Sequence, residues 1–257
     1  AASTGFAGDR SDERIERIAS WIELPSALLD LDAGDTTIGH VDSTGKAPWG
    51  YMQDVADTEA GVLFIGTTGL VTLHNRTRGY GSSAAVDVSV SAEVIDPGVR
   101  LSSGIAGVVN DITVSRPGGA TVRVVDSVSV STYGVLGEAI DTIGDSDLDA
   151  LNRANWELAT RSTPVVKLPE LTLDGLTEPA SAADVRALDI GSRIEVTDLP
   201  AQAPESIADL RVQGYTERIG AGGWTVTANT TPYLAVTSLI LDDPVRGLLD
   251  SGNVLAY

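Results

Sequence analysis

Alternating apolar and polar positions run almost without interruption from Ala84 to Ser131, and they resume from Arg186 to Val236. The clearest stretch, Val86–Val94, is apolar at every even position and polar at every odd position. A period of two places one face of a strand in a core and the other in water. Because a helical segment separates the two blocks, we expect one antiparallel barrel or sandwich with a helical insertion.

Turn residues bound the strands within these blocks. Gly118–Gly119 and Gly222–Gly223 are interpreted as hairpin turns rather than phosphate-binding loops, because neither pair opens a helix. The expected strands lie at residues 86–95, 108–115, 121–131, 193–199, 210–218 and 223–229.

Helical periodicity precedes the first block. A helix is expected to begin at Ser11–Asp12 and to end at Pro25, with Ile15, Ile18 and Ile22 on one face. The residues that follow are rich in aspartate and glycine, which predicts a loop with one short strand at most. This loop extends from about residue 28 to residue 46.

A second helix and a hairpin complete the N-terminal part. Pro48 suits the first position of a helix that runs to Thr58, since proline there lacks only a donor that would be unpaired anyway. Residues 61–76 predict two strands joined by a tight turn at Gly66–Gly69. The glycines and serines of residues 78–83 then predict a domain boundary.

A third helix is expected from Asp145 or Ser146 to Thr160. Its predicted core face carries Leu148, Leu151, Asn155 and Leu158. The expected fold is therefore α+β and mostly β. It comprises a small N-terminal α+β module at residues 1–82, a β-barrel or sandwich domain at 83–236 with its packed helix at about 145–160, and a C-terminal arm at 237–257.

The chain is strongly acidic. Its 257 residues include 36 acidic and 17 basic side chains, a formal net charge of −19, and Lys46 and Lys167 are the only lysines. Without a basic stripe, the chain is not suited to wrapping duplex DNA. A GC-rich coding genome or a salt-adapted source accounts for the excess of aspartate and arginine, and the ordinary valine and threonine content favours the first.

Residue types absent from the sequence narrow its chemistry. It has no cysteine, which excludes disulfides, thiol catalysis and thiolate metal sites. No run of 18 apolar residues is present, so no membrane-spanning helix is expected. The first nine residues lack a signal-peptide pattern, and because the chain begins without methionine we expect a processed protein or a piece of a longer polypeptide.

Two aspartate groups are candidates for cation binding. Asp145, Asp147 and Asp149 alternate as in a calcium loop, but the loop positions that need glycine and a bidentate acid hold Ala150 and Trp156. A helix N-terminus, where negative charge is favoured, is the preferred interpretation. The second group is Asp30, Asp32 and Asp35, for which a solvated turn is preferred.

Catalytic signatures are weak. His40 and His74 are the only histidines, nothing in their spacing demands a zinc site, and we expect His74 on an exposed strand position. A Ser-His-Asp triad is assembled in space, but the sequence has no Gly-x-Ser-x-Gly elbow. Trp21, Trp49, Trp156 and Trp224 are expected to anchor cores. We therefore expect no enzyme, and assign no catalytic, cofactor-binding or metal-binding residue.

Four segments, in this order, resemble the central hub proteins of phage tail tips and baseplates, which are siphophage minor tail proteins. The segments are Ala56–Arg76, Val109–Val114 with Val125–Gly134, Leu188–Val196 with Leu199–Pro200, and Leu241–Asp250. Together they cover about residues 10–250. One departure is the lack of the further barrel that such hubs usually carry before the first module, which suggests a fragment or a split hub.

This resemblance implies a homotrimeric ring that closes the distal end of the tail tube in the virion, assembled in the host cytoplasm. Its partners would be neighbouring tail-tube, distal-tail and tip proteins, and genomic DNA would pass without specific binding. The hypothesis that acidic side chains face the channel stands beside the alternative that they only solubilise the outer surface. Two rival functions remain: a tail-associated cell-wall hydrolase domain, and a receptor- or glycan-binding β-sandwich.

Overall fold

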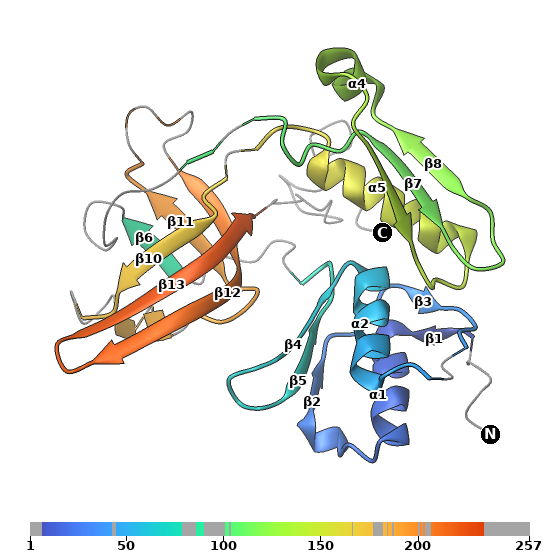
Figure 1. The fold of residues 1–257 in the computed structure, drawn as a ribbon, viewed down its shortest axis with the longest axis horizontal. Helices are drawn as coiled ribbons and strands as arrows, with labels where there is room; N and C mark the ends of the chain where they lie inside the picture. The colour runs from blue at the N-terminus through green and yellow to red at the C-terminus, as the bar shows by residue number, and fades with distance from the viewer. Residues whose placement is uncertain are drawn as a thin grey trace, which may run out of the picture. The chain divides into compact units, whose positions relative to one another are not determined.

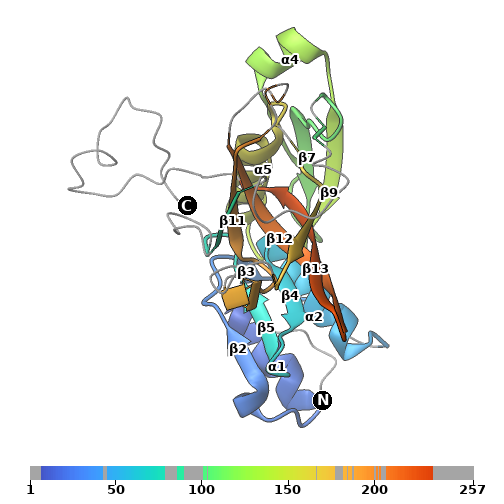
Figure 2. The same cartoon turned by 90° about the vertical axis from the view of Figure 1, so that its left-hand side faces the viewer.

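The fold is mixed α+β and mostly β, as predicted (Figures 1 and 2). The chain divides into two compact units, one formed by Ala1–Arg78 with Gly107–Thr163 and the other by Gly79–Ala106 with Pro164–Val254. The computed structural model describes residues 7–42, 45–78, 86–89, 101–102, 104–165, 167–176, 182–183, 185–186, 188–199, 201, 203 and 207–233.

The first unit begins with two helices and two small sheets. β3 pairs antiparallel with β1, while β5 lies between β2 (parallel) and β4 (antiparallel). The elements are β1 (Asp9–Arg10), α1 (Ser11–Trp21), the 3-10 turn η1 (Ser26–Leu28), β2 (Leu29–Leu31), β3 (Thr37–Ile38), α2 (Pro48–Glu59), β4 (Val62–Ile65) and β5 (Val71–His74).

Both predicted N-terminal helices are confirmed. Ile15 and Ile18 of α1 are buried, whereas Ile22 lies beyond the helix end and is 48% exposed. Pro48 occupies the first turn of α2, and Ala60 ends the helix in the left-handed conformation. The predicted hairpin also forms, with the Gly69 amide donating to the Gly66 carbonyl at 2.9 Å. One apolar cluster joins α1, α2 and β5.

A third sheet, of three strands, belongs to the same unit. β7 (Asp111–Ser115) lies between β8 (Val122–Val125), which is antiparallel to it, and β9 (Gly137–Asp141), which is parallel. Helix α5 (Asp147–Arg161) covers one face, where Ile112 and Val114 pack with Ala150, Ala154 and Leu158 (Figure 1). The short helix α4 (Ser127–Tyr133) connects β8 to β9.

The predicted strand over residues 121–131 is wrong beyond Val125. The Asp126 side chain accepts hydrogen bonds from the amides of Val128 and Ser129, both at 3.0 Å. This N-cap satisfies two amides that a helix start would leave unpaired, and it outweighs the β preference of the valines that follow. The chain therefore turns into α4, which Gly134 ends at a φ of 81°.

The predicted core face of α5 is also wrong. Leu148 is 63% exposed and Leu151 is 37% exposed, while Ala150 and Ala154 are buried. The helix lies against the β7–β8 strands, and two alanines one turn apart let its backbone approach the sheet closely. Only Leu158 of the predicted face lies in the core.

The second unit is built on one five-stranded sheet, which curls in Figure 1. Its strand order is β10-β13-β12-β11-β6, antiparallel except for the parallel pair β11–β6. Its apolar residues, including Leu171, Leu210 and Ile194, form a single buried cluster. The strands are β6 (Val86–Ser89), β10 (Glu170–Asp174), β11 (Arg193–Thr197), β12 (Ala208–Gly220) and β13 (Gly223–Pro232).

The division of the chain differs from the predicted domains. The boundary near Arg78 is present, but residues 107–163 belong to the first unit and not to a domain spanning residues 83–236. The physical reason is that β7, β8, β9 and α5 complete their own sheet and core from contiguous sequence. The strand prediction for residues 90–95 and the C-terminal arm lie outside the described residues. None of the helices in the described ranges has the length and hydropathy needed to span a bilayer.

A fully buried arginine holds the start of the first unit together. Arg14 of α1 is 0% exposed. Its guanidinium donates to the Asp9 carboxylate at 2.9 Å, to the Tyr51 hydroxyl at 2.6 Å, and to two backbone carbonyls of the β3 segment at 3.3 Å. The pKa of the Asp9 carboxyl is lowered, first by its hydrogen bond from Arg17 and also by Arg14. This network links α1, α2, β1 and β3.

Replacing Arg14 by leucine is expected to destabilise the protein by about 3 kcal/mol, because it leaves buried acceptors without their donor. Arg17→Leu is the matched control on the same helix: the Arg17 side chain is 35% exposed, so its ion pair with Asp9 is worth less than about 1 kcal/mol. Urea unfolding followed by circular dichroism measures both variants. Equal losses for the two would contradict this role of Arg14.

Candidate functional site

Asp145, Asp147 and Asp149 lie at the N-terminus of α5, which is the interpretation that the sequence favoured over a calcium loop. The Ser146 hydroxyl accepts from the Asp149 amide at 3.1 Å, and the Asp149 carboxylate accepts from the Ser146 amide at 3.1 Å, which makes a capping box for α5. Asp147 instead accepts from Arg116 at 2.7 Å, and this hydrogen bond lowers the pKa of its carboxyl. The Asp147 and Asp149 carboxylates thus accept hydrogen bonds from different partners.

The aspartates at 30–35 are used in a similar way. The Asp32 carboxylate accepts from the Arg78 guanidinium at 2.6 Å and from the Asn75 amide at 3.2 Å. Asp35 accepts from the Thr77 hydroxyl at 3.1 Å. Both side chains therefore bind the segment after β5 to the loop before β3. Within the described ranges, no group of three His, Cys, Asp or Glu side chains is placed to hold a metal ion.

The expectation for His74 is wrong. Its side chain is 7% exposed, and its ring makes an edge-on contact with Phe64, with 4.9 Å between the ring centroids. The cause is a cross-strand contact: Phe64 of β4, the strand that pairs with β5, packs against the His74 ring. His40, by contrast, is exposed just after β3.

The tryptophans are less buried than predicted. Trp49 is 37% exposed at the start of α2. Trp21 and Trp224 are half-buried and pack against the edges of the two main cores. Trp156 is also half-buried, beside Arg153. Trp224 fits closely over Gly175, where an added Cβ would lie 2.2 Å from the indole ring.

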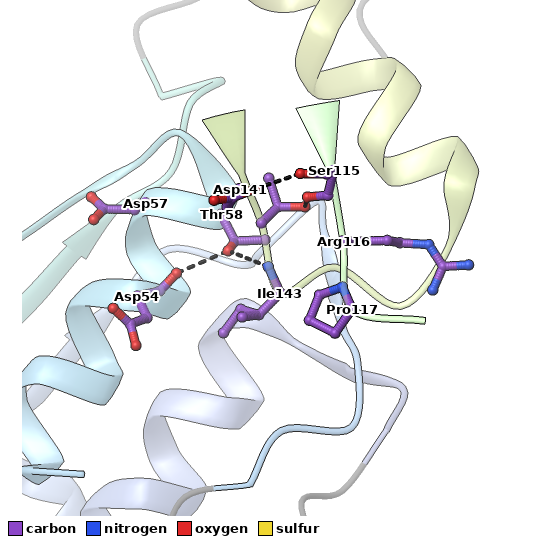
Figure 3. Close-up of a pocket in the computed structure, with 9 residues that line it drawn as sticks. Asp54, Asp57, Thr58, Ser115, Arg116, Pro117, Asp141 and Ile143 are labelled. Atoms are coloured by element: carbon purple, nitrogen blue, oxygen red, sulfur yellow. Dashed lines mark hydrogen bonds between the residues drawn. The ribbon is translucent and has the colours of Figure 1, made fainter. Parts of the chain in front are cut away.

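An acidic pocket of about 490 Å³ lies in the first unit, where α2 meets the ends of β7 and β9 (Figure 3). Thr58 forms its floor: its hydroxyl accepts from the Ile143 amide at 3.1 Å and donates to the Asp54 carbonyl at 2.9 Å. The pocket is lined by Asp54, Asp57, Thr58, Ser115, Arg116, Pro117, Asp141, Thr142 and Ile143.

Three carboxylates give this pocket its charge. Partial burial raises the pKa of the Asp57 carboxyl, nearby Arg153 opposes the shift, and Asp54 adds to it. Asp54 itself pairs with Lys46 at 2.7 Å. Asp141 accepts a hydrogen bond from the Ser115 hydroxyl. Arg116 points away from the other carboxylates in Figure 3, toward Asp147, so it does not neutralise them.

The pocket lacks the parts of a nucleophilic site. Ser115 donates to the Asp141 carboxylate, and no histidine is among the described lining residues, so the histidine of a Ser-His-Asp arrangement is not found there. A second hollow of about 530 Å³ runs along α2 and β4, and Asp54 and Asp57 line both. The arrangement is an open, acidic surface around the C-terminal half of α2.

Sequence reasoning missed the buried charges. Glu59 is 0% exposed, and its carboxylate accepts from the Ser11 hydroxyl and the Thr36 amide, both at 2.9 Å. Glu157, Arg76 and Arg153 are also largely buried. For Arg14 the sequence did carry a signal: it lies four residues before Ile18, on the same buried face of α1.

The fold is shared with two solved tail proteins, one of them from a prophage. The 43 kDa tail protein of prophage MuSo2 from Shewanella oneidensis superposes with a TM-score of 0.57 at 14% identity, covering 90% of this chain and 66% of that one. A tail protein from Neisseria meningitidis MC58 gives 0.60 at 11% identity, covering 90% and 68%. The chain thus spans about two thirds of their length. No known family matches its sequence, and no curated protein does.

Thr58→Val is expected to destabilise the protein by about 2 kcal/mol, because the swap keeps the shape but leaves the Ile143 amide without its acceptor. Thr216→Val is the control: Thr216 is exposed on β12, and its hydroxyl has no hydrogen bond within the described residues, so a change below about 0.5 kcal/mol is expected. Thermal unfolding of both variants gives the comparison. A loss in Thr216→Val as large as in Thr58→Val would count against the Thr58 bridge.

Proposed function

We propose that this chain is a structural component of a phage tail, and specifically a subunit of the hub ring at the distal end of the tail tube. The supporting observation is the shared fold with two tail proteins over 90% of this chain, at identities of 14% and 11%. A fold kept over that length, at such low identity, fits a protein whose role depends on shape.

The finer assignment to the tip relies on the ordered segments that resemble tail-tip hubs. In this proposal three copies form the ring, contact tail-tube and tip neighbours, and sit in the virion after assembly in the host cytoplasm. Two of the segments, Ala56–Arg76 and Val109–Val114, fall in the first unit, and Leu188–Val196 falls in the second. Both units therefore belong to the proposed hub.

Charge supports a passage for DNA. Three copies, each of −19, would carry a formal charge of −57. A channel lined with phosphate-binding cations would retard DNA, because each such contact contributes to affinity. Acidic side chains facing the channel would repel the phosphates and leave the duplex free to slide.

A tail-associated cell-wall hydrolase is the second candidate, and the acidic pocket is the observation that favours it. Glycosidases need two carboxyl groups, one of them with a raised pKa. Asp57 has a raised pKa, and Asp141 lies in the same pocket. Against this candidate, Asp141 is held by Ser115 and Asp54 by Lys46, which is an ordinary arrangement for surface carboxylates.

Native mass spectrometry is expected to find a trimer of this 26.6 kDa chain at micromolar concentration. Because the copies repel one another, the trimer fraction should rise when salt is increased from ~10 mM to ~150 mM, where the Debye length falls from about 30 Å to about 8 Å. Electron microscopy of the same sample should show rings with an open centre. A chain that stays monomeric at all salt concentrations would rule out self-assembly into the proposed ring.

A peptidoglycan zymogram separates the two candidates. The wild-type chain is expected to leave no cleared band, beside a lysozyme lane as positive control. Clearing that persists in Thr216→Val and disappears in Asp57→Asn and Asp141→Asn would instead establish the hydrolase and assign both carboxyl groups to it.

A further inference from the structure

Arg76 carries a buried charge with no ion pair among the described residues. It follows β5 and is 5% exposed. Its Nη1 is buried and has no hydrogen-bond acceptor, and no ion pair to Arg76 is present within the described part of the chain. Burying a charge is costly unless it is paired, so buried arginines normally contact a carboxylate or an equivalent acceptor. No such partner of Arg76 Nη1 lies among the residues that the structure describes.

Arg153 of α5 brings a second cation to the same place. It donates from Nη1 to the Asp57 carbonyl at 2.7 Å and from Nη2 to the Glu157 carboxylate at 2.7 Å, but its buried Nε has no acceptor. Burial lowers the pKa of the Arg153 guanidinium, Glu157 opposes this, and the charge of Arg76 adds to it. The two guanidinium groups therefore lie close enough to repel.

Glu157 and Glu138, the acidic side chains near Arg153 and Arg161, already form ion pairs. Glu157 is shared between Arg153 and Arg161, which it meets at 3.1 Å, and Arg161 also pairs with Glu138 at 2.6 Å. The Asp57 carboxylate is the remaining acid that acts on Arg153, and it lies at an exposed position lining the acidic pocket.

A third unsatisfied donor adjoins this pair. The indole Nε1 of Trp156 is buried and has no acceptor among the described residues. The Arg153 guanidinium lies 5.5 Å from the centroid of that indole ring. Arg153 Nε, Arg76 Nη1 and Trp156 Nε1 are thus three buried N–H donors, two of them cationic, with no acceptor among the described residues.

We infer that Arg76 and Arg153 bind a small inorganic anion, which accepts hydrogen bonds from Arg76 Nη1 and Arg153 Nε. An anion satisfies the donors and also offsets the repulsion between the two guanidinium groups, whereas an internal water supplies only the acceptor. Because the donors are buried, the occupant is small: chloride or phosphate rather than a partner's side chain. The site is independent of the proposed role in the tail.

Thermal unfolding at a fixed sodium concentration tests the site. Chloride or phosphate replaces gluconate stepwise, and gluconate serves as the reference anion because it is too bulky to enter. A ligand bound only by the folded state raises the unfolding midpoint as the ratio of its concentration to Kd grows. We expect a rise of about 5 °C at ~100-fold excess over Kd. Unchanged midpoints with both anions would refute the inference.

Two variants test whether the anion-dependent rise of the unfolding midpoint arises at Arg76. Arg76→Met keeps an unbranched apolar stem but removes the charge and the donors, so its midpoint should no longer depend on the anion. In gluconate it should unfold no earlier than the wild type, since an uncompensated buried charge has been removed. Arg218→Met is the control, because Arg218 is exposed on β12, and it should keep the full wild-type response. An undiminished response in Arg76→Met would place the anion elsewhere and overturn the assignment.

Crystals of the wild-type protein soaked in sodium bromide provide a readout that does not depend on folding of the variants. Bromide substitutes for chloride and scatters anomalously. An anomalous peak within hydrogen-bond distance of Arg76 Nη1 is expected. Density for a water molecule, or no density, at that position would reject the anion.

Discussion

The first unit depends on two fully buried charges, Arg14 and Glu59, that hold the segment at residues 34–39 onto α1 and α2. Neither acts through charge alone: each also satisfies backbone groups that would otherwise be buried and unpaired. The fit is close, since a Cβ on Gly34 would lie 1.9 Å from the Ser11 hydroxyl. These contacts let a small number of apolar residues specify one arrangement of two short helices.

Local elements could be predicted where one physical signal dominated. The isoleucine spacing of α1, Pro48 at the start of α2 and the glycine turns all act within a few residues of sequence, and each matches the structure. The neighbours with which a strand pairs, by contrast, could not be predicted from its own sequence pattern. Alternation in residues 108–115 indicates a half-buried strand, but nothing in the pattern says which sheet the strand joins, and so it does not reveal that β7 belongs to the first unit.

The same limit applies to the candidate sites. That Asp145–Asp149 would begin a helix could be derived from its neighbours in sequence. That His74 would be covered depended on Phe64, which the pairing of β4 with β5 brings against its ring. The pocket around Thr58 and the pair Arg76 and Arg153 each join residues about eighty positions apart, and single-sequence spacing carries no signal at that range.

The hairpin of β12 and β13 extends past its neighbour. β11 pairs with β12 only at Ala208–Arg211, so from Gly214 to Gly220 the described structure leaves one backbone edge of β12 open. An unpaired strand edge can form backbone hydrogen bonds with the edge of another sheet, which leads to edge-to-edge aggregation. Glu217 and Arg218 stand on this edge, where their charges disfavour such joining. Any contact between copies of this chain is therefore expected to avoid β12–β12 pairing along this stretch.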